Sequence, residues 1–136
     1  MKQCFVFDID GTLAIKWDRD IYDYTRVWLD TPNDWICDVY IYLSQEYHDF
    51  IVCSGREDSC REETMQWLTK HLYCPPKFLY MRKTGDHRAD DIVKKEMLDE
   101  IRKEYEITAW FDDRDKVVKM LRENWVTVCQ VNYWNF

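Results

Sequence analysis

Residues 3–12 are Gln-Cys-Phe-Val-Phe-Asp-Ile-Asp-Gly-Thr, and they set the organisation of the whole chain. The apolar run before the first acid is continuous rather than alternating, which is typical of a strand buried on both faces of a parallel sheet. Two acids, Asp8 and Asp10, follow the run directly, and Gly11 lets the chain turn without steric cost. The stretch therefore predicts a central strand over 3–8 that ends in paired carboxylates.

Similar apolar runs occur at 50–53, 77–81, 107–111 and 126–131. Helix-like stretches lie between them, from Thr31 to about Glu46 and roughly over 58–71, 89–104 and 115–124. Strands that alternate with helices predict an α/β fold with three Rossmann-like layers around a mostly parallel sheet of about five strands.

Two of the predicted helices show further sequence signals, one for the start of a helix and one for the face that packs on the core. Thr31-Pro32 is expected to start the first helix, with Thr31 as N-cap and Pro32 at the first helical position. In the third helix, one apolar stripe is expected to face the core. Its members are Ile92, Val93, Met97, Leu98 and Ile101.

Polar residues follow three of the predicted strands. They are Asp8, then Ser54-Gly55-Arg56, then Asp112-Asp113. Ligands of open α/β sheets bind beyond the carboxyl ends of the strands, so these groups should converge on one site. Their carboxylates suit Mg²⁺, whereas a calcium EF-hand loop that starts at Asp8 would need Glu where Arg19 stands.

Length, net charge and cysteine content limit which classes of protein this chain can belong to. The chain has 136 residues, 46% of them hydrophobic, which fits one domain with a single core. No apolar stretch is long enough to cross a membrane, and Cys4, Cys53 and Cys129 lie in predicted core strands. We therefore expect a soluble, cytoplasmic protein with reduced thiols. Its net charge of −7 argues against a long basic groove for nucleic acid, but not against recognition of a strand end.

These motifs resemble the four motifs of the haloacid dehalogenase (HAD) superfamily. The set is Phe7-Asp8-Ile9-Asp10-Gly11-Thr12, Ser54-Gly55-Arg56, Lys94 and Asp112-Asp113. The resemblance implies a Mg²⁺-dependent phosphatase in which Asp8 forms an aspartyl-phosphate and Asp10 is the general acid and base. Ser54 would bind a phosphate oxygen, and Lys94 would neutralise charge. The metal would be held by Asp8, Asp10 and Asp112 or Asp113. We also expect burial and the Asp8 charge to raise the pKa of Asp10.

A closer resemblance concerns residues 81–94, Gly11-Thr12-Leu13-Ala14 with Arg19 downstream, and Asp112-Asp113-Arg114. These are similar to phage-type polynucleotide kinase/3′-phosphatases, which implies a role in nucleic-acid repair. The resemblance carries over a substrate-binding set of Thr12, Arg19, Gly55, Arg56, Arg82, Asp90 and Arg114. Asp90 also stands one helical turn before Lys94, where it can orient that side chain.

The chain is expected to be a single domain over 1–136, with a very small cap inserted at about 15–46. Trp17, Tyr22, Tyr24, Trp28 and Trp35 are expected to pack that cap, with stacking of a terminal base by Trp17 or Tyr22 as the alternative. No G-x-x-x-x-G-K-[ST] phosphate loop is present, so no kinase domain is expected.

The predicted function is removal of 3′-phosphates from DNA or RNA ends, or from nucleotides, with a separate kinase or ligase as partner and no membrane association. The alternatives are a HAD phosphatase for small metabolites or 5′-nucleotides, and a non-catalytic nucleic-acid-binding protein with a relic site. An intact nucleophile, acid, lysine and metal-ligand set argues against the relic.

Overall fold

The computed structural model describes residues 1–16, 19–47 and 49–134. Its centre is a five-stranded sheet in the order β5-β4-β1-β6-β7, in which every neighbouring pair is parallel. The strands are β1 (Lys2–Phe7), β4 (Phe50–Glu57), β5 (Phe78–Arg82), β6 (Tyr105–Arg114) and β7 (Val128–Trp134). The predicted α/β fold class is confirmed.

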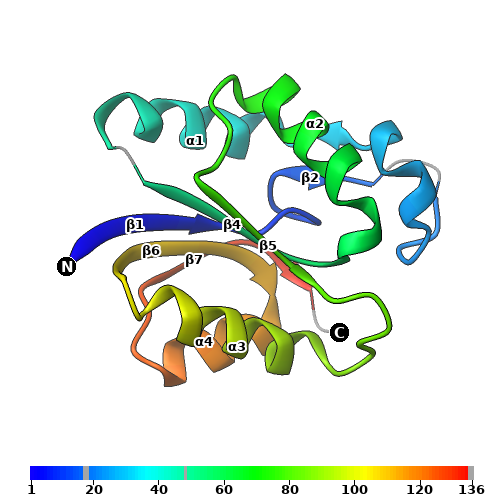
Figure 1. Ribbon diagram of the computed structural model, residues 1–136. Coiled ribbons are helices and arrows are strands. Elements are labelled where there is room, and N and C mark those ends of the chain that lie inside the picture. The colour runs from blue at the N-terminus through cyan, green and yellow to red at the C-terminus, as the bar shows by residue number, and fades with distance from the viewer. Residues whose placement is uncertain (17–18, 48, 135–136) are drawn as a thin grey trace.

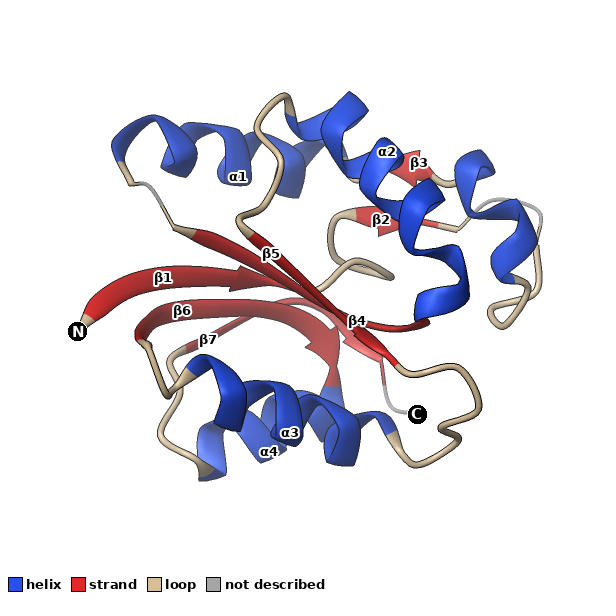
Figure 2. Cartoon of the chain, in the orientation of Figure 1, coloured by secondary structure: helices blue, strands red, loops and turns tan. Residues whose placement is uncertain are grey.

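Helices cover both faces of this sheet (Figure 1). On one face lie α1 (Asp34–Glu46) and α2 (Arg61–Leu72), and on the other lie α3 (Asp90–Ile101) and α4 (Asp115–Glu123). The smaller elements are β2 (Ala14–Ile15), β3 (Thr31–Pro32) and the 3₁₀ turns η1 (Tyr24–Leu29) and η2 (Asp58–Cys60). Figure 2 shows the resulting sandwich of helix, sheet and helix.

The core is divided by the two-residue period of the strands. Phe5 and Phe7 of β1 point into the cluster beneath α1 and α2, where the Phe7 ring stacks on Phe111 at 4.3 Å between centroids. Cys4 and Val6 point into the cluster beneath α3 and α4. A strand with apolar residues on both faces is what the continuous run at residues 4–7 predicts.

The start of α1 differs from the prediction. Thr31-Pro32 is not the helix start but strand β3, which pairs antiparallel with β2. Asn33 is the N-cap, and its side-chain amide donates to the Thr12 carbonyl oxygen at 3.0 Å. The backbone pairing therefore uses the two residues that sequence signals assign to the helix.

The segment 15–46, predicted as a cap, ends in a helix that belongs to the core layers. Ile36, Cys37 and Tyr40 of α1 are buried against the sheet. Of the helices and strands described in the predicted cap, only the β2–β3 pair and η1 lie outside the helix and sheet layers. Three of the aromatics expected to pack there, Tyr22, Trp28 and Trp35, are exposed, so their predicted packing role is wrong. Trp17 lies outside the described residues.

Two further positions differ from the predicted core. Cys129 is exposed because β7 is an edge strand. Ile92 of α3 is 48% exposed, whereas Leu98 is completely buried. Successive helical residues are about 100° apart, which puts Ile92 on the side of the helix opposite Ile101. Within the described residues, no helix is long and apolar enough to cross a membrane.

This contrast gives a matched pair of substitutions on one helix. Leu98→Ala should lower the free energy of unfolding by about 2–5 kcal/mol, because it leaves a cavity between α3 and the sheet. Ile92→Ala should change it by under about 1 kcal/mol. Urea unfolding of both variants tests the assignment, and equal losses would contradict it.

Candidate active site

The site lies at the carboxyl edge of the sheet, where three neighbouring strands end. Asp8 directly follows β1, Ser54 lies in β4, and Asp112 with Asp113 lies near the end of β6. The backbone N–H of Asp8 donates to the Phe111 carbonyl oxygen at 2.9 Å, which fixes the end of β1 against β6. Parallel pairing therefore brings acids about a hundred residues apart in sequence to one edge, as predicted.

Lys94 joins these acids. Its Nζ donates to Asp8 Oδ1 at 2.8 Å and to Asp112 Oδ2 at 2.9 Å, and it lies 3.6 Å from Asp90 Oδ2. Burial alone would lower the pKa of Lys94, but the charges of Asp112, Asp8 and Asp90 outweigh it and raise that pKa well above its ordinary value. The ammonium group is therefore a fixed positive charge beside Asp8.

The two adjacent acids of β6 have different surroundings. Asp112 accepts four hydrogen bonds: from Lys94, from the Trp110 indole at 3.2 Å, and from the backbone N–H groups of Asp113 and Arg114 at 2.9 and 3.2 Å. Asp113 accepts a longer bond from the Thr12 hydroxyl, at 3.3 Å. The oxygens of Asp112 are thus occupied by donors, whereas Asp113 keeps lone pairs for another ligand.

The acids form a cluster that suits a divalent cation. Ligand oxygens of Asp8, Asp112 and Asp113 lie within 4.8 Å of one another, and all three residues are buried. Burial and the charge of Asp112 raise the pKa of Asp8 well above its ordinary value, although Lys94 lowers it. Burial is also the main cause that raises the pKa of Asp113 to about 6. Hard oxygen ligands with excess negative charge fit Mg²⁺.

Gly11 is required by this packing. Its φ is +82°, and a Cβ atom there would lie 2.0 Å from Asp113 Oδ2. A side chain at position 11 would therefore displace the acid that comes from the other strand. The glycine permits close approach of the loop after β1 to β6 as well as the turn itself.

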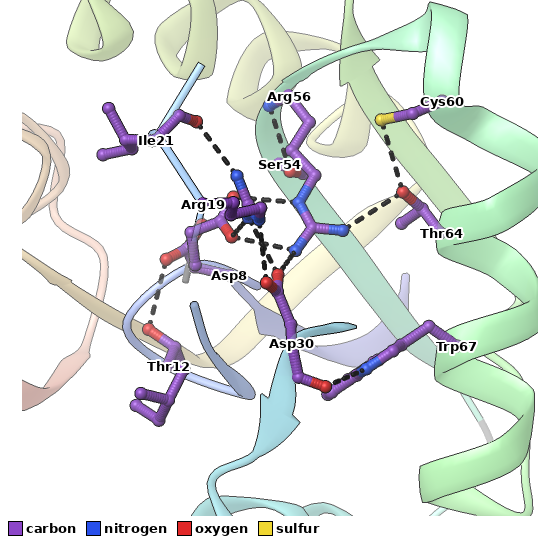
Figure 3. Close-up of polar contacts among 12 residues, drawn as sticks. Asp8, Thr12, Arg19, Ile21, Asp30, Ser54, Arg56, Cys60, Thr64 and Trp67 are labelled. Atoms are coloured by element: carbon purple, nitrogen blue, oxygen red, sulfur yellow. Dashed lines mark hydrogen bonds and ion pairs between the residues drawn. The ribbon is translucent and has the colours of Figure 1, made fainter. Parts of the chain in front are cut away.

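A second network holds Asp10. Arg56 forms a two-pronged ion pair with it, from Nε to Oδ2 at 2.9 Å and from Nη2 to Oδ1 at 2.8 Å. Arg19 adds a contact of 3.2 Å to Oδ1. Both guanidinium groups also bind Asp30, and Figure 3 shows them converging on that carboxylate.

This network overturns the expected pKa of Asp10. Burial raises it, but the charge and hydrogen bonds of Arg56, followed by the charge of Arg19, outweigh burial and leave the pKa lowered. At neutral pH Asp10 is therefore ionised. Asp8 is the nearest charge along the sequence, whereas the two arginines reach Asp10 only in the folded chain.

Asp30 is the main site residue that sequence reasoning missed. Its side chain is fully buried and accepts from Arg19 at 2.8 Å and from Arg56 at 2.7 Å, while its carbonyl oxygen accepts from the Trp67 indole at 2.8 Å. Thr64 of α2 completes the shell by accepting from Arg56 at 3.2 Å. Asp30 follows no predicted strand, so no local signal marks it.

Asp90 occupies the centre of a third group of contacts. Besides the contact with Lys94, Asp90 Oδ1 lies 3.3 Å from Arg82 Nη2, and Asp90 Oδ2 lies 3.5 Å from Arg114 Nη1. Burial raises its pKa, but Lys94, Arg114 and Arg82 together lower it. The contact between Asp90 and Lys94 joins the two residues of the i, i+4 pair, and the role of Asp90 in orienting Lys94 stays a prediction.

Ser54 and Gly55 complete the predicted set. Ser54 is buried, and its oxygen accepts from the Arg56 backbone N–H at 3.1 Å, which leaves its own proton to donate. A Cβ at Gly55 would meet Asp90 Oδ1 at 2.3 Å. Arg82 donates to the Gly55 carbonyl oxygen at 2.9 Å and to carbonyl oxygens of Asp86 and Arg88. These contacts show that Arg82 supports the loop after β5.

Two surface hollows lie away from this site. One of about 900 Å³ runs along the outer face of α2 between Asp58 and Lys70, and one of about 530 Å³ lies beside α4 and β7. Neither is lined by Asp8 or Asp10. The site is defined instead by its cluster of charges at the ends of the strands.

The fold and these clustered groups define a HAD-type α/β domain. The family model described as "Polynucleotide kinase PNKP phosphatase domain" matches residues 2–136, and the chain belongs to this family of phosphatase domains. The predicted resemblance and the predicted enzyme class, a phosphatase, are thereby confirmed.

Individual relatives agree with this assignment. The chain is 33% identical over 120 residues to a protein of Autographa californica nuclear polyhedrosis virus named as a bifunctional polynucleotide kinase/RNA ligase; the match covers 85% of this chain and 17% of that protein. A chain in a solved Pnkp1/Rnl/Hen1 complex superposes with a TM-score of 0.93 at 36% identity, over 100% of this chain and 48% of that one. A chain in a structure of the Pnkp1/Rnl/Hen1 RNA repair complex gives the same score and identity, over 99% and 44%. The chain thus spans half or less of the length of these relatives.

The raised pKa of Asp113 predicts how pH changes the stability of the metal-free protein. An ordinary aspartate has a pKa of 3.8 and Asp113 about 6, so its contribution to stability is present below about pH 4 and is lost as pH rises through 6. Asp113→Asn should therefore raise the free energy of unfolding at pH 7 by on the order of 1–2 kcal/mol, and by less at pH 5.

Thermal unfolding in excess EDTA between pH 5 and pH 8 measures this difference. Asp38→Asn, at an exposed position of α1, is the matched control and should leave the pH profile unchanged. A metal-free Asp113→Asn protein less stable than the wild type at pH 7 would contradict the assignment.

Proposed function

We propose that this domain is a Mg²⁺-dependent phosphatase that removes 3′-phosphates from polynucleotide ends or nucleotides through an aspartyl-phosphate on Asp8. The observation that carries the proposal is the contact between the buried Lys94 ammonium and Asp8 Oδ1, at 2.8 Å, beside the acids of β6. An aspartate that only solvated the protein surface would not need a buried ammonium group in contact with its carboxylate.

Asp8 is the proposed nucleophile. One of its oxygens attacks phosphorus, a bond to phosphorus forms there, and the bond from phosphorus to the 3′-oxygen breaks. Lys94 and the Thr12 hydroxyl, which donates to Asp8 Oδ2 at 3.2 Å, hold the carboxylate in one orientation. Because the contacts are made before substrate binds, no reorganisation is needed at the reacting atom.

Asp10 is the proposed acid for the leaving 3′-oxygen and the base for the water that hydrolyses the aspartyl-phosphate. Since Asp10 is ionised at neutral pH, the proposal requires that the negative charge of a bound phosphate favours its protonated form. Asp10 then gives that proton to the 3′-oxygen and, as a carboxylate again, takes a proton from the water. Its side chain is 30% exposed, so it can meet a substrate, while Arg56 and Arg19 fix its direction. Both guanidinium groups are buried and already donate to Asp10 and Asp30, so their role in this proposal is to position the acid. The Ser54 hydroxyl, whose proton is not used in the contact with the Arg56 backbone, is the proposed donor to a phosphate oxygen.

Mg²⁺ would be held by Asp8, Asp113 and the carbonyl oxygen of Asp10, with Asp112 in a supporting role. The hydrogen bonds already accepted by Asp112 and the lone pairs left on Asp113 favour this choice between the two. Bound there, the ion neutralises charge on the phosphate as a Lewis acid. Its charge would also relieve the repulsion that raises the pKa of Asp8 and Asp113.

The substrate assignment rests on the family and its relatives. The family carries the name of polynucleotide kinase, and the relatives are named for RNA ligation and RNA repair. Since those relatives are longer than this chain, we also propose that a kinase or ligase works with it, in the same polypeptide or as a separate protein. A cytoplasmic location is part of this proposal.

Asp8→Asn should abolish phosphate release, lowering kcat by at least about a thousand-fold, because an amide cannot act as the nucleophile. Release of inorganic phosphate from a 3′-phosphorylated oligonucleotide measures the effect, and circular dichroism checks that the variant is folded. Turnover retained in the folded variant would exclude the aspartyl-phosphate.

Matched substrates test the position of the phosphate. Phosphate release should be rapid from a 3′-phosphorylated oligonucleotide and from 3′-mononucleotides, at least about ten-fold slower from the 5′-phosphorylated isomer, and lost in EDTA until Mg²⁺ is restored. Equal rates on the two isomers would favour the alternative of a general small-metabolite or 5′-nucleotide phosphatase.

A further inference from the structure

Asp113, the proposed direct ligand of Mg²⁺, stands where the pairing of β6 and β7 is irregular. Asp112 of β6 lies opposite Gln130 of β7, and the register of the two strands shifts between Asp112 and Arg114. Irregularities of this kind re-aim side chains and are frequent next to active sites. The direction of the Asp113 carboxylate therefore depends on what holds the Asp113 backbone at this point.

Two side chains hold the polar groups of that backbone. The Asp113 N–H donates to Asp112 Oδ1 at 2.9 Å, and the Asp113 carbonyl oxygen accepts from Gln130 Nε2 at 3.2 Å. Gln130 Nε2 also donates at 2.7 Å to Oδ1 of Asp115, the first residue of α4. Because a carbonyl and a carboxylate are both acceptors, the amide nitrogen of Gln130 faces them rather than its oxygen. The glutamine thus links β7 to the end of β6 and to the start of α4.

The Asp113 carboxylate has little room to move. Thr12 donates to its Oδ1 at 3.3 Å, and the loop at Gly11 comes so close that a Cβ atom there would lie 2.0 Å from its Oδ2. One of its oxygens belongs to the acidic cluster whose ligand atoms lie within 4.8 Å of one another. A small rotation of the Asp113 backbone would carry that oxygen away from the cluster. The hydrogen bond from Gln130 to the Asp113 carbonyl opposes such a rotation.

We propose that Gln130 is a positioning residue that sets the Mg²⁺ affinity of the site by holding Asp113 through its backbone. This inference rests on the proposed Mg²⁺-dependent function. Among the described residues, Gln130 makes no hydrogen bond to the proposed nucleophile or to the proposed acid, so its effect reaches the reaction through the metal. Residues one step behind a metal ligand typically contribute about ten- to a hundred-fold to metal affinity.

Gln130→Met removes both hydrogen bonds and keeps the length of the side chain. The apparent Kd for Mg²⁺, measured from the rise of the unfolding temperature with Mg²⁺ concentration, should increase about ten-fold. The kcat at saturating Mg²⁺ with a 3′-phosphorylated oligonucleotide should stay within about two-fold of the wild type, because the residues that touch phosphorus are unchanged. Gln66→Met, the same change at an exposed glutamine of α2, is the matched control and should leave both values unchanged.

Two substitutions of Asp115 test the same contact from its other side. Asp115→Asn keeps an oxygen that can accept from Gln130 Nε2, whereas Asp115→Ala removes it, and both remove the same charge. The apparent Kd for Mg²⁺ should therefore be about three-fold higher in Asp115→Ala than in Asp115→Asn, the size of effect that one hydrogen bond supplies. Equal Kd values in the two variants would contradict the proposal. This pair decides the question should Gln130→Met not fold in EDTA.

The outcomes separate this inference from the function on which it rests. A wild type that binds Mg²⁺ and releases phosphate, with the same Kd for Mg²⁺ in Gln130→Met, overturns the role of Gln130 and keeps the phosphatase. A loss of kcat at saturating Mg²⁺ with an unchanged Kd also overturns that role. A wild type that binds Mg²⁺ more tightly than Gln130→Met but releases no 3′-phosphate keeps the role and overturns the phosphatase. A wild type that binds no Mg²⁺ overturns both the metal site and this inference.

Discussion

The buried ammonium group of Lys94 is the interaction on which the rest of the site depends. It bridges Asp8, which follows β1, and Asp112, from β6, while Asp90 of its own helix lies behind it. All of these groups are buried. Loss of one partner from such a pair leaves an uncompensated charge, which typically costs about 3–5 kcal/mol. The positions of α3, β1 and β6 at this edge are therefore coupled through one side chain.

The charged residues of the site form two separate networks, one centred on Lys94 and one on Arg19 and Arg56. The Lys94 network surrounds Asp8 and leaves excess negative charge beside Asp113. The Arg19–Arg56 network holds Asp10 and balances two carboxylates with two guanidinium groups. Because each network is anchored to different elements, the pKa of Asp8 is raised and that of Asp10 is lowered, although only one residue separates them.

The two networks also differ in where their residues lie in the chain. The acids of the Lys94 network stand at the ends of β1 and β6, which parallel pairing brings together. Asp30, which completes the Arg19–Arg56 network, directly precedes β3 and lies outside the central sheet. The orientation of Asp10 therefore depends on a residue that no strand of the central sheet supplies.

Sequence by itself determined the order of strands and helices, the fold class and the acids at the strand ends. It did so because apolar runs and strand-end acids are local patterns, and parallel pairing then leaves one edge on which they can meet. It failed at Thr31-Pro32, where pairing with β2 competed with a helix start, and at Ile92, where the side chain's direction depends on how α3 lies on the sheet. The low pKa of Asp10 and the role of Asp30 were decided only by the tertiary structure. Both depend on the distances among Arg19, Arg56 and Asp30, and electrostatic energies fall with distance in space rather than along the chain.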